Sequence, residues 1–93
     1  MPTQITKIEL NSGRRILLRV EGEMLLHDAE LIERIVRQTF EKLGTTVIID
    51  LADLDFLDSE AASILRRLEQ RGEAQIDGVE IFLQTAVDMA ERV

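Results

Sequence analysis

Residues 47–60 read VIIDLADLDFLDSE. The opening run, 47–51, is almost continuously apolar, rich in β-branched side chains and too short for a helix, which is typical of a central strand buried on both faces. Five carboxylates fall within residues 50–60, just before a helical pattern begins. In open sheets covered by helices, sites gather where strands end. This stretch therefore predicts both a central strand and the place of a site.

Upstream, two short runs predict a β-hairpin. Residues 5–10 and 14–20 flank Asn11-Ser12-Gly13, a triplet that tolerates the positive φ of a tight turn. In the second run, one face is wholly apolar, whereas the other carries Leu17 between the charged Arg15 and Arg19, so this strand is expected to be covered mainly on one side. The residues on its apolar face are Ile16, Leu18 and Val20.

From Asp28 the apolar spacing changes to three and four, which predicts a helix that ends near Gly44. Asp28 is the expected N-cap, and Gly44 suits the left-handed residue after the helix. Two pairs of opposite charges lie four residues apart on the expected outer face and should be solvated. They are Glu30 with Arg34 and Glu33 with Arg37.

After a loop at 52–57, a second helical pattern runs from Ser59 to Arg71. Residues 79–83 follow Gly78 and predict another strand, and residues 85–93 predict a short closing helix. The expected order is β-β-α-β-α-β-α. The sequence thus predicts a single α/β domain over residues 1–93, with helices packed on a mixed, mostly parallel sheet.

Composition excludes several classes of function. Eleven Lys and Arg against 18 Asp and Glu give a net charge of −7, which disfavours a nucleic-acid partner. The chain has no cysteine and one histidine, so neither disulfides nor a cluster of Cys or His metal ligands is expected. No apolar run is long enough to insert in a bilayer, and the N-terminus lacks the pattern of a signal peptide. We expect a cytoplasmic protein without a cofactor.

The acidic stretch does not match the catalytic and metal-binding patterns that it superficially suggests. Asp53 and Asp55 have the spacing that opens a calcium loop, but Leu57 stands where a third oxygen ligand belongs. Phosphoryl transfer to Asp50 would need a lysine late in the chain to meet the phosphate, and the lysines of this sequence are Lys7 and Lys42. His27 is the single histidine, the residue type used most often in general acid–base catalysis, and no Ser-His-Asp arrangement accompanies it. The sequence therefore predicts a protein that is not an enzyme.

Ser59 offers a different chemistry. A serine in the first turn of a helix presents its hydroxyl outward, beside backbone N–H groups that can meet a phosphate. Its phosphorylation would add negative charge beside Asp58 and Glu60 and change what the surface can bind. The alternative is purely structural, with Ser59 or Asp58 serving as the N-cap of the helix. The two roles are compatible.

The pattern of residues 47–59 resembles the STAS domain family, whose members carry an apolar strand, an acidic-apolar loop and an Asp-Ser or Asp-Thr step that opens a helix. Here that step is Asp58-Ser59. Gly22-Glu23-Met24, followed by residues 27–29, resembles the family's second marker, between strand two and helix one. The resemblance spans essentially the whole chain.

The resemblance implies a domain that binds protein partners and has no catalytic activity. In the antagonist branch, the matching serine is phosphorylated by an anti-sigma factor kinase, which makes Ser59 the expected phosphoacceptor. The partner surface would comprise Gly22, Glu23 and the loop residues Asp53, Asp55, Asp58 and Glu60. The alternative implied by the family is a subunit that docks on the ATPase of an ABC-type lipid transport complex without phosphorylation.

Two departures from the family pattern bear on these expectations. Glu60 and Ala61 follow the serine where antagonists have a second small residue and a glycine, so a permanent charge adjoins the acceptor. Leu25 replaces an aspartate, and the pair Leu25-Leu26 is expected in the core, with an apolar contact surface as the alternative.

A basic patch on the second helix is interpreted as solvated surface, or else as a docking face for an acidic partner. Its residues are Arg66, Arg67 and Arg71.

Overall fold

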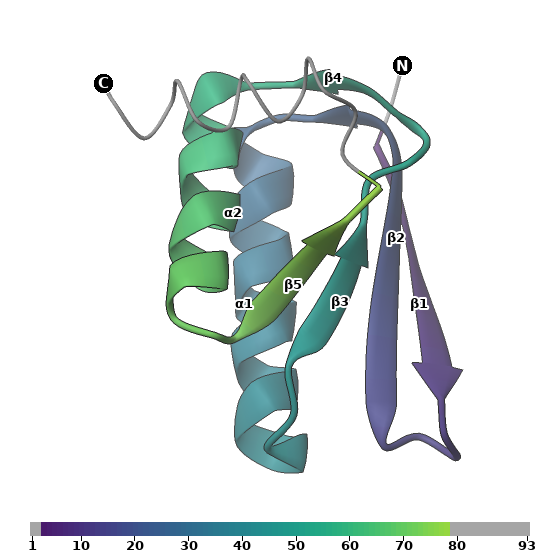
Figure 1. Ribbon diagram of the computed structural model, residues 1–93. Helices are drawn as coiled ribbons and strands as arrows, with labels where there is room; N and C mark the ends of the chain where they lie inside the picture. Colours follow the sequence, from purple (N-terminus) through teal and green to yellow (C-terminus); the bar gives the residue numbers. More distant parts are fainter. Residues whose placement is uncertain (1–2, 79–93) are drawn as a thin grey trace.

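The computed structural model describes residues 3–78 and shows a sheet with two helices packed against it (Figure 1). Its element order is β-β-α-β-β-α-β. The elements are β1 (Gln4–Leu10), β2 (Arg15–Met24), α1 (Leu26–Leu43), β3 (Val47–Asp50), β4 (Leu54–Leu57), α2 (Ser59–Gln70) and β5 (Ala74–Asp77). The strand predicted at 79–83 and the closing helix predicted at 85–93 lie outside the described residues.

Strand β2 is the centre of the sheet. It pairs with β1 in antiparallel fashion along its length, and on its other side with β3 and then β4, both parallel. Strand β5 pairs with β3, also parallel, so the main path is β1-β2-β3-β5. The predicted hairpin is confirmed, with positive φ at all three residues of the turn, Asn11, Ser12 and Gly13. The sheet is mixed and mostly parallel, as predicted.

Both described helices lie on the same face of the sheet (Figure 1). Ile16, Leu18 and Val20 of β2 are buried against them, which confirms the predicted one-sided strand. The prediction that the 47–51 strand is buried on both faces is wrong within residues 3–78. Val47 and Ile49 are buried, but Ile48 points to the opposite face and is half-buried. No buried polar or charged residue interrupts the described core.

Helix α1 begins at Leu26, three residues earlier than an N-cap at Asp28 would imply. Asp28 occupies the third helical position, and its carboxylate accepts a hydrogen bond from the Leu25 N–H at 3.0 Å. It therefore satisfies a backbone donor before the helix instead of being the N-cap itself. At the other end, Gly44 adopts φ 70° and its N–H donates to the Phe40 carbonyl, as the sequence predicted. Neither described helix combines the length and apolarity needed to span a bilayer.

Two strands were not predicted. Residues 54–57 were expected in a loop but form β4, and residues 74–77, for which no element was predicted, form β5. Strand β4 is only four residues long and carries Asp55 and Phe56 exposed at its middle, so alternation gives no signal. It exists because β2 extends beyond β3 and offers unpaired backbone groups at Gly22 to Met24.

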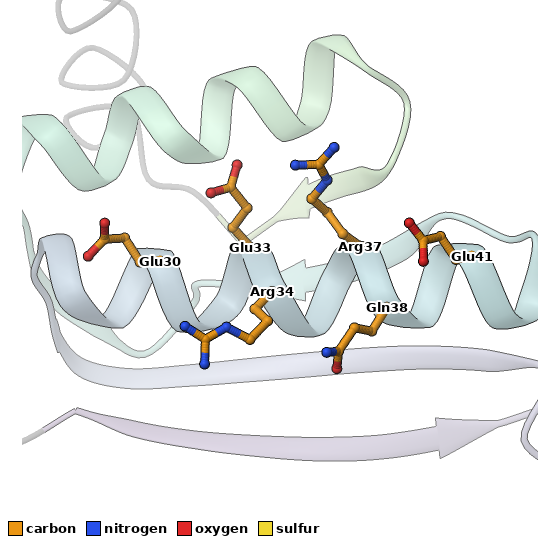
Figure 2. Close-up of a pocket in the computed structure, with 6 residues that line it drawn as sticks. All are labelled: Glu30, Glu33, Arg34, Arg37, Gln38 and Glu41. Atoms are coloured by element: carbon orange, nitrogen blue, oxygen red, sulfur yellow. The ribbon is translucent and has the colours of Figure 1, made fainter.

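The charged surface of α1 is less solvated than predicted. Glu33 pairs with Arg67 of α2 at 2.9 Å rather than with Arg37, and Arg37 lies 3.9 Å from Glu73. Figure 2 shows Glu33 and Arg37 reaching towards α2, while Arg34 points the other way. A hollow of about 460 Å³ runs along this surface, with all its described lining residues on α1. They are Glu30, Glu33, Arg34, Arg37, Gln38 and Glu41.

These pairs also bear on the predicted basic patch. Arg67 is held by Glu33, and Arg66 lies 3.2 Å from Glu69 within α2. Each contact is solvent-accessible, so each contributes only about 0.2–1 kcal/mol. Two of the three arginines are thus engaged within the fold, which weakens the alternative of a free docking face.

Gly78 fits closely against the turn after β3. Its φ is +76°, and a Cβ there would come within 2.7 Å of both the Ala52 nitrogen and Asp50 Oδ1. The Leu51 N–H donates to the Asp77 carbonyl at 2.9 Å, which holds the two segments together. This contact positions the start of the 52–60 loop.

We expect Gly78→Ala to lower the free energy of unfolding by about 2–5 kcal/mol, from backbone strain and overpacking together. Gly72→Ala is the matched control, because Gly72 has φ +73° but no atom within 4 Å of the position that a Cβ would take. It should cost about 1–2 kcal/mol from strain alone. Urea denaturation measures both, and equal losses would contradict the close contact.

Candidate partner-binding site

The predicted site residues meet at one end of the molecule. The carboxyl ends of β2 and β3 and the first turns of α1 and α2 lie there, at the top of Figure 1. Residues 52–60 cross this end, carrying β4 along the last residues of β2. The position agrees with the rule that sites gather at the carboxyl ends of strands.

Asp58 holds the start of α2 in place. Its N–H donates to the Met24 carbonyl at 2.9 Å, and its Oδ1 accepts from the Glu60 N–H at 2.8 Å. Its carbonyl accepts the first helical bond, from Ala62. Asp58 is therefore the N-cap, and of the two caps left open by the sequence Ser59 is not the one used.

Ser59 is the first residue of α2 and is exposed. Its carbonyl accepts from the Ser63 hydroxyl at 3.2 Å, so its backbone is part of the helix while its side chain faces outward. The amides of a first helical turn have no acceptor within the helix. The Asp58 cap uses that of Glu60, and those of Ser59 and Ala61 lie beside it.

Gly22 and Glu23 lie next to the loop, as predicted, but in different roles. Gly22 is buried, has φ +84° at a break in the strand register, and donates its N–H to the Asp53 carbonyl at 3.4 Å. It contributes a backbone bend, not a side-chain contact surface. Glu23 pairs with Phe56 and is half-buried. The Thr3 hydroxyl contacts both the Glu23 carbonyl and the Asp28 carboxylate.

The acidic residues divide into two groups. Asp53, Asp55 and Glu60 are exposed, and Asp58 is half-buried by its capping role. Together with Ser59, these four acidic residues make the surface that we call the acidic rim. Asp50 is apart from it: its Oδ1 accepts from the Ala52 N–H at 3.0 Å, and its Oδ2 lies 3.4 Å from Arg19 Nε. Asp50 therefore shapes the turn.

Two large apolar side chains lie beside these acidic residues. Phe56 is 49% exposed, in a segment that was expected to be a loop. Leu25 is 41% exposed, so the preferred core position is wrong for it and the exposed alternative is the one that the structure shows. Leu26 does pack against the core, because the helix begins there and turns Leu25 outward. Sequence reasoning had no signal for the exposure of Phe56, because strand alternation would place it on the same face as the buried Leu54.

The geometry of the described residues does not support His27 as a catalytic residue or a metal site in the acidic loop. The His27 side chain is 94% exposed and has Glu30 at 3.6 Å as its charged neighbour. In residues 3–78 no three His, Cys, Asp or Glu side chains are grouped so that they could hold a metal ion.

Comparison with known proteins identifies the family. The STAS domain model matches residues 6–91, so the chain belongs to the STAS domain family. The structure of the anti-sigma factor antagonist SpoIIAA in its unphosphorylated form superposes with a TM-score of 0.70. It has 19% sequence identity, over 95% of this chain and 81% of that one.

A second solved structure is the STAS domain of an antisigma-factor antagonist from Rhodobacter sphaeroides. It superposes with a TM-score of 0.55 at 20% identity, over 80% of this chain and 82% of that one. No curated protein matches the sequence significantly. At these identities the structural matches establish the fold, which resembles that of anti-sigma factor antagonists.

We expect Asp58→Ala to lower the free energy of unfolding by about 1 kcal/mol, because the Glu60 N–H loses its cap. Asp55→Ala removes a neighbouring exposed carboxylate that makes no capping bond and should change stability by less than about 0.5 kcal/mol. Thermal or urea unfolding compares them. If the two variants lose the same stability, the capping role of Asp58 is wrong.

Proposed function

We propose that this STAS protein is a non-catalytic regulator that binds a protein partner of the anti-sigma factor kinase type, and that phosphorylation of Ser59 switches the binding. The partner surface is the acidic rim together with Glu23, Phe56 and Leu25. The family assignment supports a regulatory protein–protein role, and the geometry around Ser59 supports the switch.

The observation that carries the proposal is the exposure of Ser59 directly after a cap that holds α2 without it. Because the Asp58 carboxylate caps the helix, the Ser59 hydroxyl is not needed for the fold. A kinase can reach it without unfolding the helix. A phosphate at this position also meets the positive end of the helix dipole, which favours its charge.

The acidic rim explains how such a modification would act. A phosphoserine carries about −1.5 to −2 charges at neutral pH. Here it would stand between Asp58 and Glu60, with Asp53 and Asp55 in the same loop. A partner that contacts the rim in its unmodified state would then face a much more negative surface, so binding should weaken while the fold persists.

Phe56 and Leu25 would supply apolar contact area for the partner, which the charged residues of the acidic rim do not provide. Large apolar side chains near the middle of an interface carry most of its binding energy, while charged groups around them set specificity and association rate. Both side chains lie exposed on the segments that frame the acidic rim. They are the proposed apolar anchors for the partner.

The first test is phosphopeptide mapping of the protein isolated from its native host. We expect one phosphate on Ser59 and its loss in Ser59→Ala. Ser63→Ala is the matched control, because Ser63 is also exposed and lies one turn further along α2. It should retain the phosphate. A chain that is never phosphorylated, or that keeps its phosphate in Ser59→Ala, would overturn the switch.

A kinase purified from the same host by its ability to phosphorylate Ser59 then serves as the binding partner. We expect Ser59→Ala to bind it, and Ser59→Asp to bind at least tenfold more weakly, measured by calorimetry. Should Ser59→Ala and Ser59→Asp instead copurify equally with an ABC-type ATPase, the protein is the phosphorylation-independent transport subunit. That result would replace the kinase proposal.

We further expect Phe56→Ser to weaken binding of the same partner by at least tenfold, since an interface anchor contributes about 2 kcal/mol or more, roughly thirtyfold. Leu43→Ser is the control, an apolar residue of 37% exposure at the opposite end of α1. The affinity of Leu43→Ser for the partner should stay within twofold of the affinity of the unchanged protein. Circular dichroism checks that both variants are folded, and unchanged affinity in Phe56→Ser would exclude it as an anchor.

A further inference from the structure

Strand β1 is an edge strand of the described sheet. It pairs with β2 along one side, and in residues 3–78 no strand pairs with its other side. Figure 1 places it at the edge away from α2. Seven residues long and regular, it presents a row of backbone N–H and C=O groups of the kind that another strand can meet.

We infer that β1 is a self-association edge, at which two copies of this chain pair their β1 strands in antiparallel fashion about Ile8. This interaction is separate from the proposed partner surface, and it would stand if Ser59 were never phosphorylated.

The charges of Lys7 and Glu9 favour a second copy of β1 as the partner strand, and they favour one register of the two strands. Lys7 and Glu9 lie on the helix-bearing side of β1, because they pair with the core residues Leu18 and Ile16 of β2. Both are exposed, and no ion pair within residues 3–78 engages either. A lone lysine on an edge strand discourages pairing. Here Glu9 follows two residues later on the same side, so the Glu9 of a second copy can lie opposite Lys7 and neutralise its charge.

Only one symmetric register matches the charges. Pairing about Ile8 places Lys7 opposite the second copy's Glu9 and repeats the same contact by symmetry. Pairing about Lys7 would set two lysines opposite each other, and pairing about Glu9 would set two glutamates opposite each other. Opposite charges that face each other across strands stabilise the pair, and like charges destabilise it.

The same register also joins the apolar residues of the sheet's open face. Ile8 pairs with Leu17 of β2, and Leu17 pairs with Ile48 of β3, so the three form a row across the side away from the helices. All three are half-buried. In the paired form Ile8 meets Ile8 of the second copy, and the row continues across both sheets. Registers about Lys7 or Glu9 would place Ile8 opposite Thr6 or Leu10 instead.

The paired segment is short, which sets the expected affinity. The register overlaps Thr6 to Leu10 in both copies, since Asn11 already belongs to the turn. Interfaces that bury less than about 1,200 Å² are usually weak or transient. We therefore expect a dimer that forms only as the protein concentration is raised, and not an obligate one.

The test is sedimentation equilibrium of the full chain up to millimolar concentration, with charge-reversal variants. Lys7→Glu and Glu9→Lys should each raise the dimer dissociation constant by about tenfold or more, because two cross-strand pairs change from attraction to repulsion. An equimolar mixture of the two variants should recover association, since each then faces its opposite charge. The double variant Lys7→Glu/Glu9→Lys should also dimerise.

Arg34→Glu is the control, because it makes the same change in net charge as Lys7→Glu at an exposed position of α1. It should leave the dimer unchanged. In the unchanged protein, amide NMR signals of residues 6–10 should shift with concentration while those of β5 do not. A monomer at every concentration, or association that the two single variants do not weaken and their mixture does not recover, would overturn the inference.

Discussion

Strand β2 organises the described structure because its ten residues pair with three other strands. Its first part holds β3 and, through β3, β5. Its last part extends beyond β3, where Gly22 to Met24 pair with β4. The backbone groups of this extension need partners, and β4 supplies them. The path from Asp50 to Asp58 is thereby held against the end of β2, and the position of the second helix follows from it.

The candidate site is a consequence of this pairing. Strand β4 leads directly into Asp58, whose N–H is bound by the Met24 carbonyl and whose carboxylate caps α2. Ser59 is left as an outward-facing residue on a helix that does not depend on its hydroxyl. The same pairing turns Phe56 outward beside Glu23. The strand pairing of β4 and the Asp58 cap therefore bring a hydroxyl, several carboxylates and an exposed aromatic side chain to the same end of the molecule.

The placement of both described helices on one face of the sheet has a second consequence. Ile16, Leu18 and Val20 are fully covered, whereas Leu17 and Ile48 on the other side are only half-buried. The helices cover the centre of the sheet and β5, and β1 is left as an edge with Lys7 and Glu9 exposed. The surface proposed for partner binding and the edge proposed for self-association are thus separate on one small domain.

Much of this could be predicted from the residues. The hairpin turn at 11–13, the helical stripes, the strand at Val47–Ile49 and the step Asp58-Ser59 are local patterns, and their elements follow from turn chemistry and periodicity. The errors concern elements whose existence depends on distant partners. Strand β4 has no alternation and forms because β2 is longer than β3. Leu25 is exposed because the helix begins at Leu26, with Asp28 satisfying the Leu25 N–H.

Sequence alone therefore determined the fold class, the order of most elements, and where the acidic residues of the candidate site lie along the chain, because these depend on side chains close together in the sequence. The tertiary structure decided that Asp58 and not Ser59 caps the helix, that Gly22 is buried, that Glu33 pairs with Arg67, and that Phe56 is on the surface. Each of those outcomes depends on which backbone groups and side chains from remote segments meet, and local periodicity carries no information about such contacts.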